Sequence, residues 1–368
     1  MAVDAARRLF QQAAPQQAVL DACLRLRDWS EPDGQAALHE ALALDADSTA
    51  VDQRYRQRVL KALVAALQKQ GVELHEPLLE HYLQILGDAP PSSRWTQRTY
   101  EVAPGERVRL RVHDGIGGGT ETGGMVWGAA LVLCAWLMRQ PAAELQGCDV
   151  LELGAGTGLC GLALAQCRRA RRVVLTDVVP ATLDNLRHNA ARLPSTATPC
   201  EVVPLDFCDP AEFLRNPTAD EADGSGAGGG GGGGGSGNGG GGGDDGCWGD
   251  VLIGADLVYE PTLAAPLATT LEMLLSAQPS RGRRRALIAS VRRTETWELF
   301  VREVAARGLV ARDRTAEAHA AMAAADGAAS EAAGNTGDAW GCPFWLAAEE
   351  VERVHLLEIT TGPQLQPE

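Results

Sequence analysis

Glycines at every second position follow a short apolar run near the middle of the chain. Gly154, Gly156 and Gly158 come directly after Val150–Leu153. A side chain at these positions would hold a ligand away from the backbone, and a helix that starts there offers free N–H groups. The spacing G-x-G-x-G differs from the pyrophosphate-binding G-x-G-x-x-G, and no Lys-Ser/Thr pair of a P-loop follows. Taken alone, the stretch is compatible with a ligand cradle or with an ordinary glycine turn.

Acidic residues end several successive apolar segments, at Glu152, Asp177, Asp206 and Asp256. Ligands of parallel sheets bind at the carboxyl ends of the strands, so we expect the four carboxylates on one rim. Each acid alone is also compatible with a helix cap or a turn. Glu152 disfavours a phosphate and suits a cationic or hydroxyl-bearing ligand. Asp177, about 20 residues after the glycines, suits ribose hydroxyls. This combination predicts S-adenosylmethionine as the cofactor.

Aromatic residues accompany the acids. Phe207 follows Asp206 directly, and this pair suits the edge and face of an adenine ring, with core packing as the alternative. Trp127 precedes an apolar stretch at 128–139 that predicts a helix. A tryptophan is costly to leave loose, so we expect Trp127 either in the core or in the wall of the ligand pocket.

Alternating strands and helices position these residues. A β-hairpin is expected at 96–102 and 107–113, with its turn at Pro104-Gly105. Strands of a buried sheet are expected at 150–153, 172–177, 201–207, 250–259, 285–291, 309–311 and 354–360. Helices separate most of them, and the last two strands without a helix between them imply an open sheet with one antiparallel strand. The fold class is therefore α/β.

Composition suggests the domain organisation. Residues 1–90 carry Leu, Val and Ala at helical spacing and predict a small helical domain, and residues 95–360 hold the α/β domain. Residues 218–246 are almost all Gly with Ser, Asn and Asp, so they cannot offset their chain entropy and are expected to be a disordered insertion. A second insertion, rich in Ala and Gly, is expected at 313–340, helical or disordered.

Charge and cysteine content restrict the class of partner. The 368 residues have a formal net charge of −15, which disfavours nucleic acid and is compatible with a basic protein partner or with solubility alone. The nine scattered cysteines form no C-x-x-C pair, which predicts reduced thiols and no metal site. No apolar run is long enough for a membrane span, and we expect no secretory signal. We expect a cytoplasmic monomer without membrane or nucleic-acid partners.

The chain resembles the seven-strand S-adenosylmethionine-dependent protein-lysine methyltransferases at Trp127, Glu152–Gly158, Asp177, Leu205–Phe207 and Gly254–Tyr259. Residues 63–86, with Gln-Gly-Val-Glu-Leu-His-Glu-Pro-Leu-Leu-Glu-His-Tyr, and residues 290–300 resemble the branch that acts on eukaryotic elongation factor 2. The resemblance implies a Rossmann-like seven-stranded sheet with helices on both faces. It also implies a protein-lysine N-methyltransferase whose protein substrate is elongation factor 2.

Roles follow from the resemblance residue by residue. It implies a cofactor site made by Trp127, Gly154, Ala155, Gly156, Asp177, Phe207 and Ala255, to which the strand-end pattern adds Glu152 and Asp206. The class usually has Trp at Phe207, so the aromatic face is kept and the indole N–H is lost. The resemblance places Asp256 and Tyr259 near the substrate lysine, where we expect Asp256 to orient the amine and Tyr259 to shape its channel. The alternatives are a methyltransferase for another protein or a small molecule, and a non-catalytic binding module of the same fold.

Overall fold

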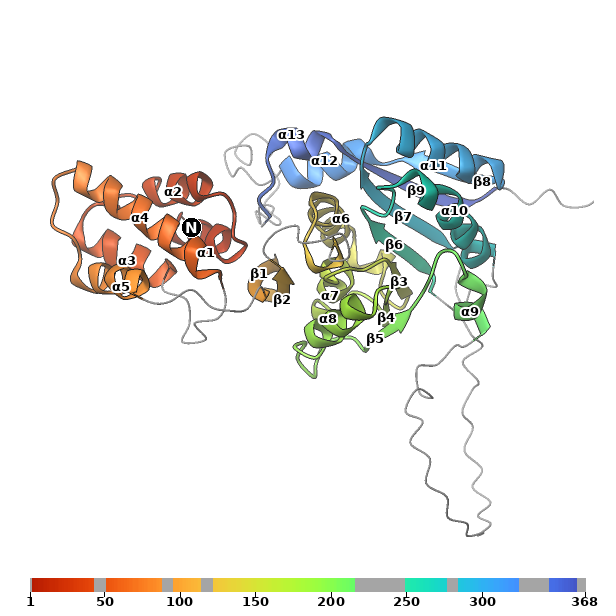
Figure 1. Ribbon diagram of the computed structural model, residues 1–368, viewed down its shortest axis with the longest axis horizontal. Helices are drawn as coiled ribbons and strands as arrows, with labels where there is room; N and C mark the ends of the chain where they lie inside the picture. The colour runs from red at the N-terminus through yellow and green to blue at the C-terminus, as the bar shows by residue number, and fades with distance from the viewer. Residues whose placement is uncertain are drawn as a thin grey trace, which may run out of the picture.

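A helical layer, a hairpin and a sheet with flanking helices follow one another along the molecule (Figure 1). The computed structural model describes residues 2–42, 51–87, 95–113, 122–215, 249–276, 284–323 and 344–362. The predicted insertion at 218–246 lies outside these residues.

The N-terminal layer is helical, as the apolar spacing predicted. Its helices are α1 (Ala2–Gln11), α2 (Gln16–Leu24), α3 (Pro32–Leu42), α4 (Gln53–Lys69) and α5 (Glu76–Gly87). Helix α4 begins at the N-cap Asp52, whose side chain accepts a hydrogen bond from the backbone N–H of Tyr55 at 2.9 Å. The layer has its own apolar core around Phe10, Leu38 and Leu60. Such a core is what an independent domain needs, although the predicted boundary at residue 90 stays a prediction.

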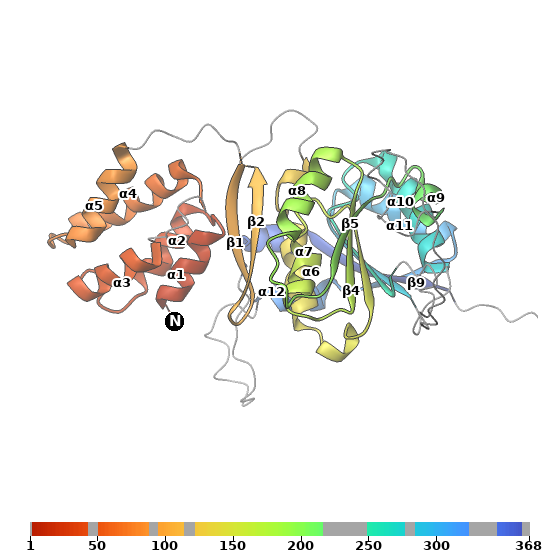
Figure 2. The same cartoon turned by 90° about the horizontal axis from the view of Figure 1, so that it is seen from below.

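A β-hairpin separates this layer from the larger part of the chain (Figure 2). Strands β1 (Trp95–Ala103) and β2 (Glu106–His113) pair antiparallel, and the predicted turn at Pro104-Gly105 is confirmed. Alternate residues such as Tyr100 and Leu110 are buried in the core of the α/β part. The hairpin therefore packs on that part as an additional layer.

The sheet contains seven strands in the order β5-β4-β3-β6-β7-β9-β8. Its strands are β3 (Asp149–Leu153), β4 (Arg172–Asp177), β5 (Cys200–Pro204), β6 (Val251–Ala255), β7 (Arg285–Val291), β8 (Leu309–Asp313) and β9 (Val354–Thr361). Strand β9 pairs antiparallel with both β7 and β8, and the other pairs are parallel. The predicted open sheet with one antiparallel strand is therefore confirmed. The expected absence of a helix between the last two strands is wrong, because Thr315–Ala323 and Ala348–Glu352 form helices between β8 and β9.

Helices cover both faces of the sheet, because successive residues of each buried strand point to opposite sides. Val150 packs toward one group of helices and Leu151 toward the other. The first face carries α6 (Gly128–Arg139), α7 (Leu159–Gln166), α8 (Pro180–Ala190) and α12 (Thr315–Ala323). The second face carries α9 (Pro210–Arg215), α10 (Pro261–Ser276) and α11 (Thr294–Ala306). The remaining short elements are η1 (Thr122–Gly124), η2 (Ala142–Glu144) and α13 (Ala348–Glu352).

The start of the predicted insertion at 313–340 needs correction. Residue 313 still belongs to β8, and α12 follows at once. Ala318, Ala321 and Met322 of α12 are buried in the core that also contains α6. Alanine is a strong helix former, so the Ala-rich composition at this point marks a packed helix. Residues 324–340 lie outside the described residues.

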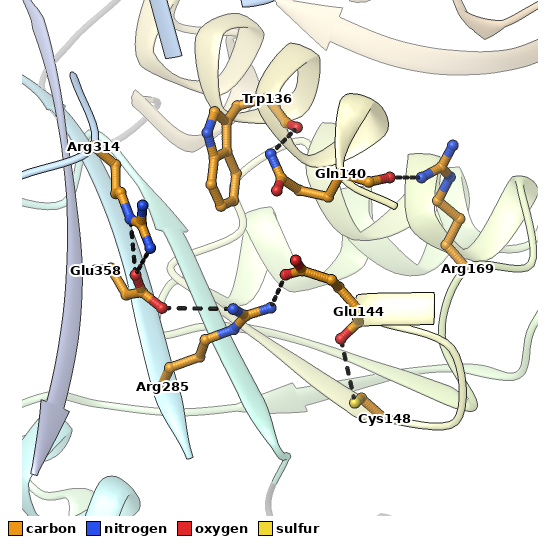
Figure 3. Close-up of polar contacts among 8 residues, drawn as sticks. All are labelled: Trp136, Gln140, Glu144, Cys148, Arg169, Arg285, Arg314 and Glu358. Carbon is orange, nitrogen blue, oxygen red and sulfur yellow. Dashed lines mark hydrogen bonds and ion pairs between the residues drawn. The ribbon is translucent and has the colours of Figure 1, made fainter. Parts of the chain in front are cut away.

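Charged residues tie the strands together at the edge of the sheet where β7 begins (Figure 3). Glu358 of β9 accepts two hydrogen bonds from Arg314, at 2.7 and 2.9 Å, and lies 3.5 Å from Arg285 at the start of β7. Arg285 also contacts Glu144 of η2 at 3.0 Å. Because Arg285 begins β7, this network lies at the edge opposite to the carboxyl ends of β6 and β7. It is part of the scaffold and leaves that other edge free for a ligand.

Among the described residues, no helix combines the length and the apolar character that crossing a membrane requires.

Candidate functional site

A cavity of about 300 Å³ opens at the carboxyl ends of β3, β4 and β6. This volume lies at the lower end of the range for small-molecule sites. The predicted carboxylates Glu152, Asp177, Asp206 and Asp256 all line it, so their shared location on one rim is confirmed. The other predicted residues line the same cavity, namely Trp127, Gly154, Ala155, Gly156, Phe207, Ala255 and Tyr259.

The glycine turn brings bare backbone to the cavity. Gly154 and Gly156 have φ of +52° and +55°, a region that residues with a Cβ rarely adopt. A Cβ on Gly154 would lie 2.6 Å from Leu257 Cδ2, and one on Gly156 would lie 3.2 Å from the carbonyl oxygen of Gly123. Side chains at these positions would fill the space between the turn and its surroundings. The positive φ angles and these close contacts therefore require glycine at both positions, and both residues line the cavity.

Asp177 joins the glycine turn to the start of α8. Its carboxylate accepts hydrogen bonds from the backbone N–H groups of Gly156 at 3.2 Å, Val178 at 2.9 Å and Val179 at 3.1 Å. Burial raises the pKa of Asp177, and these three N–H groups oppose that increase. Asp177 therefore holds the backbone just before α8 and lines the cavity, and its contact with ribose hydroxyls stays a prediction.

Glu152 lies beneath the turn, with only 3 % of its surface exposed. Its Oε2 accepts a hydrogen bond from the backbone N–H of Gly161 at 2.8 Å. Burial raises the pKa of Glu152 to about 8, because one N–H group does not replace the lost hydration of a carboxylate. The residue was expected to act as a negative charge. Burial instead disfavours the charged form of this carboxyl group, and its contact with a cationic ligand stays a prediction.

Two aromatic residues form walls. Trp127 stands at the N-cap of α6, and its Nε1 donates a hydrogen bond to the carbonyl oxygen of Thr122 at 3.0 Å. Trp127 therefore belongs to the cavity wall, one of its two expected places. Phe207 also lines the cavity, and its Cζ lies 3.7 Å from the position of a Cβ on Gly154. Neighbouring Asp206 is exposed, and its Oδ1 accepts the N–H of Cys208 at 2.8 Å.

Asp256 and Tyr259 lie on the loop after β6. Asp256 has φ of +54°, and its Oδ1 accepts hydrogen bonds from Ser290 Oγ at 3.3 Å and from the backbone N–H of Val291 at 3.4 Å. The same oxygen lies 3.3 Å from Arg293 Nη1. Tyr259 is 43 % exposed, and burial and the nearby Glu260 raise its pKa. The loop therefore presents a held carboxylate and a partly exposed ring to the cavity.

The sequence pattern missed some residues of this site. Arg293 lines the cavity and pairs with Asp256, yet the pattern offered it only as part of a resembling stretch. Another missed segment connects distant parts of the chain. Trp345 packs against the N-terminal core, and Leu346 lies near Gly128, where an added Cβ would be 3.3 Å from Leu346 Cδ1. Neither residue lines the cavity itself. Neither contact has a signal in local periodicity, because the partners are far apart in the chain.

The residues present fit S-adenosylmethionine. The ligand carries two positive groups, ribose hydroxyls and an aromatic base. The cavity offers carboxylates, aromatic walls and a glycine turn whose backbone carries no side chain. Within the described ranges, His, Cys, Asp and Glu side chains form no group of three or more that could hold a metal ion.

Comparison with known proteins gives a consistent result. Residues 106–216 match the family described as lysine methyltransferase. Among curated proteins, the putative protein N-methyltransferase FAM86B2 of Homo sapiens is 27% identical over 249 residues, which cover 67% of this chain and 69% of that protein. The protein-lysine N-methyltransferase EEF2KMT is 26% identical in Mus musculus (65% of this chain, 67% of that protein) and in Bos taurus (70% and 72%). The family match contains the glycine turn, Asp177 and Phe207, and it ends before Asp256.

Proposed function

We propose that this chain, an S-adenosylmethionine-dependent enzyme of the protein-lysine methyltransferase family, methylates a lysine of translation elongation factor 2. The observation that carries the proposal is the single cavity with the glycine cradle at its base and Asp256 and Tyr259 on the loop beside it. The substrate is suggested by the relatives named for elongation factor 2 lysine methylation.

The cofactor site in this proposal uses both backbone and side chains. The turn at Gly154 and Gly156 lets the ligand approach the backbone, with Ala155 between them and Ala255 facing it from β6. Asp177 accepts hydrogen bonds from the ribose hydroxyls, as a strand-end acid at this place does in nucleotide-binding sheets.

The rest of the cofactor site recognises the base and the positive charge. Phe207 packs against the adenine ring and Asp206 accepts from its amino group, while Trp127 closes the cavity from the start of α6. Glu152 becomes ionised when a cationic group enters, because a neighbouring positive charge favours the carboxylate.

The bound cofactor supplies a methyl group that an amine can attack. The chain itself has to align the amine with that group and to exclude water. Lysine has a pKa of about 10.4 in water, so it must lose its proton before it reacts. An aromatic and apolar entrance disfavours the ammonium form, so no strong general base is required. In this proposal Asp256 orients the amine by hydrogen bonding and Tyr259 shapes the channel.

The remaining parts of the proposal concern the whole protein. We place the enzyme in the cytoplasm as a monomer, with residues 1–90 as a domain that recognises the protein substrate. An enzyme for a small molecule has less need of such an appended layer. Light scattering of the purified protein measures the mass, and deletion of the helical layer should lower methylation of the protein substrate more than cofactor affinity.

The test is methylation with a labelled methyl donor. The purified protein is incubated with labelled S-adenosylmethionine and purified elongation factor 2, and in parallel with a cell lysate, and the labelled residue is mapped by mass spectrometry. We expect label on a lysine of elongation factor 2 and a strong reduction for Asp177→Asn. The exposed Asp184 on α8 provides the matched control Asp184→Asn. Label only on another protein, on nucleic acid or on a small molecule would contradict the proposed substrate. Absence of cofactor binding by calorimetry would favour a non-catalytic module.

A further inference from the structure

Arg293 is the one cationic side chain among the described residues that line the cavity. It shares the cavity with the four strand-end carboxylates. It contacts Asp256, which in our proposal lies nearest to the substrate lysine. Arg293 Nη1 lies 3.3 Å from Asp256 Oδ1, and the side chains are 42 % and 6 % exposed, respectively. The pair therefore has one buried anion and one cation that reaches it from the solvent side.

The position of Asp256 is fixed by more than this pair. Its backbone N–H donates to the carbonyl oxygen of Ala289 at 2.8 Å, and its Oδ1 accepts from Ser290 and Val291. These donors are neutral. A buried carboxylate is costly when no positive charge compensates it, so the guanidinium is the contact that changes the net charge of this corner.

A bare carboxylate at this place would have a consequence for a lysine substrate. It would hold the entering side chain as an ammonium ion, because an opposite charge within a few ångströms favours the charged form. An ammonium ion has no free electron pair and cannot attack a methyl group. An acid at the entrance therefore favours binding and opposes reaction unless its charge is balanced.

We propose that Arg293 is a positioning residue that balances the charge of Asp256, so that the substrate lysine enters the cavity as a neutral amine. This inference rests on the proposed lysine methylation. The guanidinium occupies Asp256 Oδ1 and adds a positive charge beside the amine, and both effects disfavour ammonium. The proton of the lysine leaves to solvent before methyl transfer.

Other charged groups surround the pair. Asp177 and Glu260 act electrostatically on Tyr259 together with Asp256. Arg292 follows β7 directly and contacts Glu298 at 3.3 Å. Across the sheet, His355 of β9 lies opposite Ser290, and Arg353 precedes that strand. Of the basic residues in this set, only Arg293 lies in the cavity lining, so its removal should affect the amine most.

The first experiment measures kcat and KM between pH 6 and pH 10 with elongation factor 2 as substrate. For Arg293→Met, we expect the rising limb of kcat to move about one unit toward higher pH, with the plateau kept. At pH 7.5, we expect kcat and KM each to fall about three- to tenfold, because the ammonium form gains a counterion. Arg293→Lys keeps the charge and should retain the wild-type limb. Arg292→Met removes the neighbouring cation outside the cavity and is the matched control.

The outcomes separate two explanations. An unshifted limb with a raised KM in Arg293→Met means that Arg293 only contacts the substrate protein, and the inference is wrong. An equal shift in Arg292→Met means that general surface charge is responsible, which also overturns it.

A second measurement needs neither activity nor an identified substrate. n-Butylammonium reproduces the end of a lysine side chain, and n-butanol is its neutral counterpart. Both are titrated by NMR into the enzyme saturated with S-adenosylhomocysteine. We expect Arg293→Met to bind n-butylammonium about three- to tenfold more tightly than wild type and n-butanol equally. Equal affinity for the cation overturns the inference. If wild type methylates no lysine, the proposed function fails, while this titration still decides whether Arg293 controls entry of a cation.

Discussion

Replacement of Glu152 by glutamine provides a pH-dependent test of the buried acid in the cavity. Its pKa is about 8 in the folded chain, compared with an ordinary value of 4.5. Between these two pH values the folded protein keeps a proton that the unfolded chain has released. The free energy of unfolding of wild type therefore falls as pH rises from about 4.5 to about 8, and this contribution is constant above that pH. Glutamine has no proton to lose, and its Oε1 still accepts from the Gly161 N–H.

The magnitude follows from the size of the shift. One pKa unit corresponds to about 1.4 kcal/mol, so the displacement of Glu152 sets an upper bound of about 5 kcal/mol at pH 8. We expect Glu152→Gln to gain about 2–4 kcal/mol relative to wild type between pH 5 and pH 8. The new amide N–H₂ group costs about 1 kcal/mol if it finds no acceptor, and this cost does not change with pH. The slope of the difference is therefore the quantity to measure.

The assay is urea unfolding at one-unit steps from pH 5 to pH 9, followed by circular dichroism. Glu80→Gln in α5 is the control. Glu80 is exposed, so this substitution removes one carboxylate without changing the cavity. A stability difference between Glu152→Gln and wild type that stays constant across this range would refute the reasoning. A constant difference would mean that Glu152 is already ionised in the folded protein at pH 5.

Two further changes test other parts of the chain. Asp177→Asn is expected to weaken S-adenosylmethionine binding about tenfold, because a charged acceptor becomes a neutral one, whereas Asp184→Asn leaves it unchanged. Calorimetry measures both, and equal dissociation constants for all three proteins would remove Asp177 from the cofactor site. Trp345→Ala is expected to destabilise the helical layer by about 2 kcal/mol, because the ring packs in that core, and to change cofactor affinity less than twofold. An unaltered unfolding midpoint would show that this packing is unimportant.

Much of the scaffold could be predicted because it depends on local pattern. Strand β7 was expected at its observed bounds, and α6 likewise, since both are apolar segments with clear ends. The shared rim of Asp177 and Asp256 followed from one physical rule, that parallel strands bring their carboxyl ends to the same edge of a sheet. The location of these two residues in the cavity is confirmed, and their roles remain predictions.

Composition predicted the structure less well where an Ala-rich stretch also forms a packed helix. The Ala-rich stretch after residue 313 was expected to be an insertion, and its first part is the packed helix α12. The pattern of Ala318, Ala321 and Met322 fits one helix face, but only a partner surface shows whether such a face is buried. That surface is formed by α6, far away in the chain.

The sequence by itself determined the order of most elements, the glycine turn and the edge on which the acids lie, because each depends on neighbouring residues and on parallel strand direction. It did not show the two helices between β8 and β9. Only the tertiary structure decided which charges are balanced. Arg293 reaches Asp256 because β7 pairs with β6 and the chain turns into α11 at that point. The pKa of Glu152 is raised to about 8 because α7 packs over its side chain and buries it. Such effects depend on distance and burial, which no one-dimensional pattern contains.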